Sequence, residues 1–184
     1  MDKKVEMGKL GEKLFKNFCL HIMPGSEVEY HHNEYALYWD AKVYWKNVVR
    51  FYQVKTGAPY ASKNAGVLHL SQQAKYIKWM NDPTIDGGDS RSRLSFLSFP
   101  CEGPERFNQK IRKNWLGKVL CLKPSVMRKA NSEMFDIQDS GKENERYIIR
   151  YTENYNCIFE DLHLLPENVE IYEDLKSLTS SKYK

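Results

Sequence analysis

The sequence predicts an α/β domain with a mixed central β-sheet flanked by helices. A segment of helical periodicity opens the chain, and segments rich in β-branched and aromatic residues follow it in alternation with polar loops. A chain of 184 residues can bury a sizeable core but rarely builds two. We therefore expect one globular domain.

The first expected element is a helix over residues 3–22. Its apolar residues recur three and four positions apart, which is typical of an amphipathic helix with one face turned inward. These residues are Met7, Leu10, Leu14, Phe15 and Phe18. Pro24 and Gly25 follow at once and end the helix.

Residues 34–55 predict a β-hairpin. The segment is dense in Val, Tyr, Phe and Trp and is interrupted only by Lys46 and Asn47, which suit a two-residue turn. With that turn, Asp40 lies opposite Gln53. Because side chains alternate along a strand, Gln53 and Lys55 share one face. Asp40, Gln53 and Lys55 are therefore expected to project together from neighbouring strands.

The remainder of the chain predicts an alternation of short strands and helices. The expected strands cover residues 67–70, 94–99, 118–122 and 147–151. The expected helices cover 71–80, with Ser71 as its cap, then 107–115, and a weakly amphipathic segment at 169–178. The last residues, from 177 onward, are expected to fray.

Charge divides the chain into two parts. Residues 1–130 carry 22 Lys and Arg against 12 Asp and Glu, whereas residues 131–184 carry 6 against 12. We expect a basic core over 1–130 that can face a polyanion, and an acidic C-terminal extension over 131–184 packed on the same domain.

Apolar runs of only a few residues and a charged N-terminal segment speak against a membrane span or a secretion signal. The four cysteines, Cys19, Cys101, Cys121 and Cys157, lie far apart and form no CxxC pair. Reduced, buried thiols in a cytoplasmic protein are the expected state.

A carboxylate, an amide and an ammonium on one sheet face suit phosphodiester hydrolysis with a hard divalent cation. Asp40 would give Mg²⁺ or Mn²⁺ an anionic oxygen, while the Gln53 side chain and the Val54 backbone carbonyl would give neutral oxygens. Lys55 would orient or deprotonate the attacking water, or neutralise charge developing on the phosphate; the sequence leaves these roles open.

Three motifs, GKLGEKLF, YWD and FYQVKTG, resemble the PD-(D/E)xK nuclease superfamily over about the first 80 residues. The resemblance implies a restriction-endonuclease-like fold, with Asp40 as metal ligand, Lys55 as catalytic lysine and Glu12 as a helical acid that helps to hold the metal. Gln53 stands where the family usually has Asp or Glu, so the site is a QxK variant, and Glu12 could restore the missing negative charge. The segment SQQAKY resembles the Gln–Tyr element of RecB-type nucleases, through Gln72 and Tyr76.

These features together predict a metal-dependent DNA endonuclease of a small stand-alone type: phage, homing, resolvase or defence. Cutting both strands of a duplex with one site per chain favours a homo-oligomer, most simply a dimer. The alternatives are a catalytically inactive nucleic-acid-binding or assembly module of the same fold, and an RNA-directed nuclease. The residues expected to contact nucleic acid are Lys9, Lys13, Lys16, Lys63, Gln72, Lys75, Tyr76, Lys78, Arg91 and Arg93.

Overall fold

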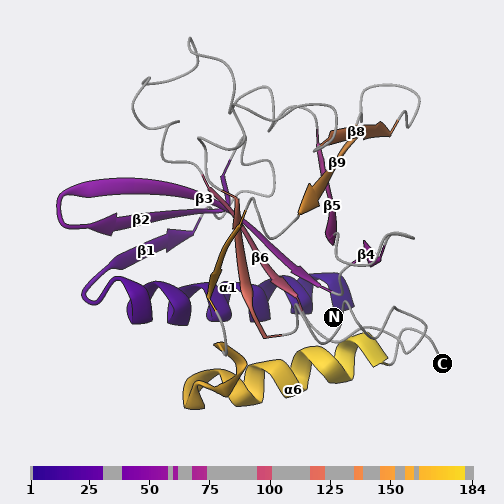
Figure 1. Ribbon diagram of the computed structural model, residues 1–184. Helices are drawn as coiled ribbons and strands as arrows, with labels where there is room; N and C mark the ends of the chain where they lie inside the picture. Colours follow the sequence, from indigo (N-terminus) through magenta and orange to yellow (C-terminus); the bar gives the residue numbers. More distant parts are fainter. Residues whose placement is uncertain are drawn as a thin grey trace, which may run out of the picture.

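The computed structural model describes residues 2–30, 39–57, 60–61, 68–73, 95–100, 117–122, 135–138, 146–151, 156–159 and 162–180. Within these residues, a six-stranded sheet, a four-stranded sheet and two long helices make a mixed α/β fold (Figure 1). The α/β class expected from the sequence is confirmed at this level. None of the described helices has the length and apolar character needed to cross a bilayer.

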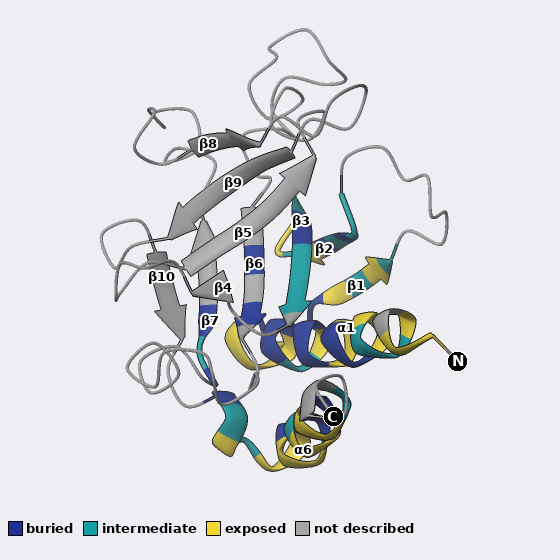
Figure 2. Cartoon of the chain, turned by 90° about the vertical axis from the view of Figure 1, so that its right-hand side faces the viewer, coloured by how far each residue is buried: buried dark blue, intermediate teal, exposed yellow. Residues whose placement is uncertain are grey.

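Helix α1 (Lys3–Ile22) has the bounds expected from its periodicity. Leu14, Phe15 and Cys19 on its inward face are fully buried, and Figure 2 shows this buried side turned toward the strands. The helix ends in a turn in which the Ser26 amide donates to the Met23 carbonyl at 3.0 Å. Gly25 has φ +76°, a left-handed conformation that glycine adopts without steric cost.

The six-stranded sheet has the order β1-β2-β3-β6-β7-β10. Its strands are β1 (Glu27–Tyr30), β2 (Ala41–Trp45), β3 (Val48–Gly57), β6 (Ser95–Pro100), β7 (Val119–Leu122) and β10 (Asn156–Phe159). The pair β3–β6 is parallel and the other pairs are antiparallel, so the sheet is mixed as expected. The strands β1 and β10 are additional to those expected, because four residues are too few for a distinct alternating pattern.

The hairpin of β2 and β3 has the register expected from the sequence. Lys46 and Asn47 form its turn with φ values of 48° and 60°, the positive angles of a two-residue turn that matches strand twist. Trp45 then pairs with Val48, and the register continues to the pair of Ala41 and Tyr52.

Alternate residues of β3 face α1. The rings of Phe15 and Tyr52 pack edge to face with centroids 5.1 Å apart. At Gly11 the helix approaches β3 so closely that an added Cβ would lie 1.9 Å from Thr56 Oγ1. The face of β3 that bears Tyr52 and Thr56 is therefore the face covered by α1, and Gln53 and Lys55 project from the other.

Helix α6 (Pro166–Ser180) packs on α1 below the sheet (Figure 1). Asn17 of α1 donates from Nδ2 to Asn168 Oδ1 at 2.7 Å, and Asn168 donates in turn to the Leu162 carbonyl in the short 3-10 helix η2 (Leu162–Leu164). Helix α6 includes the amphipathic segment expected at 169–178, and its helical turns continue to Ser180, beyond the point where fraying is expected.

The second sheet is antiparallel and has the order β4-β5-β9-β8. Its strands are β4 (Tyr60–Ala61), β5 (Leu68–Gln73), β9 (Arg146–Tyr151) and β8 (Phe135–Gln138). The expected helix start at Ser71 is wrong, because Ser71 lies inside β5 and pairs with Ile148. Pairing with a strand distant in the sequence has outweighed the local capping pattern. The rest of that helix, residues 74–80, and the helix expected at 107–115 lie outside the described residues.

The strands expected at 94–99, 118–122 and 147–151 are confirmed as β6, β7 and β9. The C-terminal third of the chain contributes β10 to the six-stranded sheet and β8 and β9 to the second sheet. Its residues are therefore integrated with those of the basic N-terminal part by backbone pairing.

Candidate functional site

Asp40 lies at the start of β2 in a bulge-like conformation. Its amide donates to the Tyr52 carbonyl at 2.8 Å, although Ala41 is already the register partner of Tyr52. Two successive residues of one strand thus face a single residue of the other, as in a β-bulge. Such an arrangement re-aims a side chain, and here it turns the Asp40 carboxylate toward β3.

Two donors from β3 hold one oxygen of this carboxylate. The Val54 amide donates to Asp40 Oδ2 at 2.8 Å, and Gln53 Nε2 donates to the same oxygen. The predicted meeting of Asp40 and Gln53 is therefore present, through a hydrogen bond. Charge-assisted bonds of this kind fix the carboxylate in position.

The Gln53 side chain is only 1% exposed, and among the described residues its carbonyl oxygen Oε1 has no hydrogen-bond partner. Buried polar atoms in native proteins are nearly always paired, because an unpaired one keeps its full desolvation cost. This oxygen is thus an acceptor in need of a donor or a cation, next to a carboxylate.

Lys55 follows Gln53 by two residues and shares its face of β3. Burial lowers the pKa of Lys55, and the negative charge of Asp40 partly opposes this effect. Since desolvation disfavours the ammonium form, this lysine gives up its proton more easily than an exposed one.

The Val54 carbonyl points to the same edge of β3 as the Val54 amide, because both groups of one residue face the same neighbouring strand. The register of β2 with β3 ends at Ala41 and Tyr52, so this carbonyl lies beyond it, on the side of Asp40. The role of the Val54 carbonyl as a backbone metal ligand stays a prediction.

Glu12 lies on α1 beside Tyr30, and its role as a helical acid at the site stays a prediction. It is exposed on α1, and its backbone carbonyl accepts a hydrogen bond from the Tyr30 hydroxyl at 2.5 Å. Burial raises the pKa of Tyr30, and the negative charge of Glu12 adds to the effect.

The oxygen donors at this site fit a hard divalent cation. Asp40, the Gln53 carbonyl and the Val54 carbonyl are the oxygen types that Mg²⁺ and Mn²⁺ accept, and water fills the other positions of such ions. Across the described ranges, no group of three His, Cys, Asp or Glu side chains is arranged to hold a metal. Asp40 and Gln53 together carry a single negative charge, so a divalent ion held by them alone would be weakly bound and would keep several waters.

Of the residues expected to contact nucleic acid, those that the structure describes lie on α1 and in β5. Lys9, Lys13 and Lys16 are exposed on α1, which lies on the opposite side of the sheet from Gln53 and Lys55. Gln72 lies in β5, a strand, and not in the helix expected over 71–80. The other expected contacts lie outside the described residues: Lys63, Lys75, Tyr76, Lys78, Arg91 and Arg93.

An aromatic cluster beside Asp40 was not expected from the sequence. The rings of Trp39 and Phe51 meet edge to face with centroids 5.7 Å apart, and the Lys42 ammonium lies 4.5 Å from the Trp39 ring centre. Strand alternation could have indicated part of this cluster. Phe51 precedes Gln53 by two residues and Lys55 by four, so all three share one face of β3.

Comparison of this chain with protein-family models, with curated proteins and with solved structures found no match.

Proposed function

We propose that this protein is a metal-dependent phosphodiesterase that cleaves DNA, with a restriction-endonuclease-like fold and a QxK variant of the PD-(D/E)xK site. The observation that carries the proposal is the buried Gln53 Oε1, an acceptor that finds no hydrogen-bond partner in the described part of the chain, next to the Asp40 carboxylate and on the same face as Lys55.

Each residue has a distinct task in this proposal. Asp40 is held in place before any substrate arrives, because the Val54 amide and Gln53 Nε2 fix one of its oxygens. Gln53 Oε1 and the Val54 carbonyl complete the oxygen donors of the chain. A Mg²⁺ or Mn²⁺ ion held by them supplies a Lewis acid and lowers the pKa of bound water.

Lys55 serves as the general base or as the cation that stabilises charge on the transferred phosphate. Its lowered pKa favours the first role, and its position near the Asp40 charge is compatible with the second. The proposal places the protein in the cytoplasm, where a buried thiol such as Cys19 stays reduced. It also includes a homodimer, which gives one site for each strand of a duplex.

The test is cleavage of supercoiled plasmid and linear duplex with Mg²⁺, Mn²⁺ or EDTA. Cleavage should require the metal, and Lys55→Met should lower its rate by about a hundredfold or more. Asp40→Asn should abolish both cleavage and Mn²⁺ binding, as measured by calorimetry. Asp174→Asn and Lys176→Met on the exposed side of α6 are matched controls that should behave as wild type.

Cleavage that survives EDTA, or that persists in Asp40→Asn, would contradict the proposal. DNA binding without cleavage in any metal would identify the protein as a binding module. Cleavage of RNA in preference to DNA of the same sequence would identify it as an RNA-directed nuclease.

A further inference from the structure

The face of the hairpin opposite α1 bears an aromatic and cationic cluster next to the Asp40–Gln53 pair. It consists of Trp39, Lys42 and Phe51, which are all partly exposed. The Lys42 ammonium lies 4.5 Å from the centre of the Trp39 ring and 5.9 Å from that of Phe51. We refer to these three residues as the aromatic shelf.

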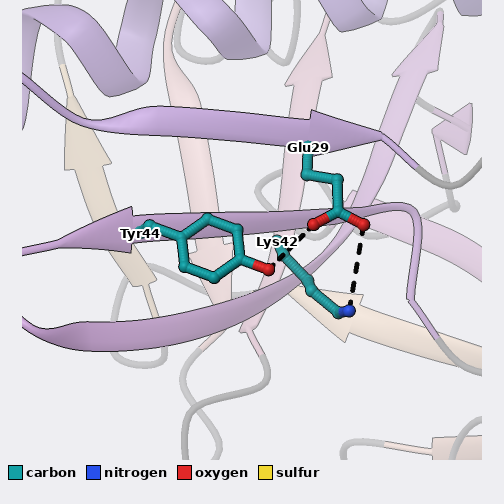
Figure 3. A network of polar contacts seen from close by, with 3 residues as sticks. All are labelled: Glu29, Lys42 and Tyr44. Atoms are coloured by element: carbon teal, nitrogen blue, oxygen red, sulfur yellow. Dashed lines mark hydrogen bonds and ion pairs between the residues drawn. The ribbon is translucent and has the colours of Figure 1, made fainter.

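Polar contacts hold the cation of the shelf in place. Glu29 Oε1 lies 3.9 Å from Lys42 Nζ, and its other oxygen accepts a hydrogen bond from the Tyr44 hydroxyl at 2.8 Å (Figure 3). The hydrogen bond to Glu29 raises the pKa of Tyr44. The Lys42 side chain is restrained by this ion pair and remains 27% exposed.

The strand register places the shelf directly beside the candidate site. Lys42 is the partner of Phe51 in the ladder, and Gln53 follows Phe51 on the same face, about 7 Å further along the strand. Trp39 immediately precedes Asp40 in the chain. The same sheet face therefore presents, in order, a pair of aromatic rings with a cation, a carboxylate with an amide, and the Lys55 ammonium.

We propose that the shelf stacks an unpaired nucleobase next to the scissile phosphate, so that the substrate is DNA with single-stranded nucleotides at the cleavage point. A base inside a duplex has both faces covered by its neighbours, whereas an unpaired base can stack on an aromatic side chain whatever its identity. Lys42 would bind the phosphate of the stacked nucleotide. The inference rests on the proposed function for the position of the scissile bond.

The test measures binding in EDTA, where cleavage does not occur. Fluorescence anisotropy would compare a labelled single strand of deoxyadenosines with a strand of equal length whose central nucleotides are abasic, at one fixed salt concentration. The wild type should bind the adenine strand more tightly. Trp39→Leu should lose about tenfold in affinity for the adenine strand and little for the abasic strand.

Trp45→Leu is the matched control on the same hairpin. Trp45 also lies near cations, with Lys46 Nζ 4.4 Å and Arg50 Cζ 5.6 Å from its ring, but its indole donates to the Pro24 carbonyl and it faces the side of α1. It should keep the wild-type preference for the adenine strand. Trp39→Phe, which retains a ring, should keep most of the preference and guards against a folding defect in Trp39→Leu.

If the wild type binds the adenine and abasic strands with equal affinity, this measurement alone overturns the inference. An equal loss on both strands in Trp39→Leu would also overturn it, because stacking requires the base. The two proposals remain separable: metal-dependent plasmid cleavage without base-dependent binding refutes the shelf alone, and base-dependent binding without cleavage refutes the catalytic function alone.

Discussion

Two glycines, Gly8 and Gly11, lie one helical turn apart on α1. Replacing each of them with alanine should change the stability of the protein in opposite directions. An added Cβ at Gly8 meets nothing within 4 Å, whereas at Gly11 it would lie 1.9 Å from Thr56 Oγ1 and 2.8 Å from Thr56 Cβ. Rotation of the Thr56 side chain moves Oγ1 away but leaves Cβ where the backbone of β3 holds it. Gly11→Ala therefore requires α1 and β3 to move apart.

The magnitudes follow from the two environments. Gly8→Ala should stabilise the protein by about 0.5–1 kcal/mol, since alanine favours a helix over glycine by that amount. Gly11→Ala gains the same stability from helix propensity, but overpacking against Thr56 lowers its free energy of unfolding by about 1–3 kcal/mol. Because the propensity cancels between the two variants, the difference between their unfolding free energies, about 1–3 kcal/mol, measures the overlap with Thr56.

Urea unfolding of the wild type and both variants, followed by circular dichroism, supplies the three free energies. A second substitution, Thr56→Gly, removes the colliding atoms, so Gly11→Ala should cost less in that background than in the wild type. Equal stability of the Gly8→Ala and Gly11→Ala proteins would show that α1 does not approach β3 at Gly11 as described.

Three further predictions concern buried groups. Burial lowers the pKa of Lys55, so the unfolded chain binds more protons than the folded one between the two pKa values, and wild-type stability should rise with pH there. Lys55→Met should consequently be more stable than the wild type in EDTA at pH 7, with an advantage that shrinks toward pH 10 in urea titrations; an advantage that grows with pH would contradict this. Gln53→Glu places a second carboxylate against Asp40 and removes a donor to it, so it should lose about 1–3 kcal/mol in EDTA and recover stability with Mn²⁺ in thermal unfolding. It should bind Mn²⁺ at least as well as the wild type, and loss of both metal and DNA binding would refute a ligand role for residue 53. Burial raises the pKa of Cys19 to about 12, so iodoacetamide at pH 8 should leave this thiol unmodified in the folded protein and alkylate it in urea, as judged by peptide mass spectrometry.

The most successful expectations from sequence are those decided by neighbouring residues. The spacing of Leu10, Leu14 and Phe18 is a direct consequence of the helical repeat, and the bounds of α1 agree with it. The pair Lys46 and Asn47 specifies a two-residue turn, and a turn of known length sets the register of the strands it joins.

Other features depend on contacts between distant parts of the chain, and local patterns carried little information about them. Ser71 has the local environment of a helix cap, yet the partner strand around Ile148 draws it into β5. The strands β1 and β10 are only four residues long and owe their extended form to pairing with β2 and β7. They are held by backbone pairing with strands distant in the sequence, which local sequence does not encode.

The candidate site combines both kinds of information. Alternation along an extended segment by itself determined that Gln53 and Lys55 share a face, because the repeat of a strand is two residues. Only the tertiary structure decided the bulge that turns Asp40 toward Val54, the isolation of Gln53 Oε1 and the location of Glu12 beside Tyr30. These depend on where α1 crosses the sheet and where β2 begins, and such distances between elements are set by packing of the whole core.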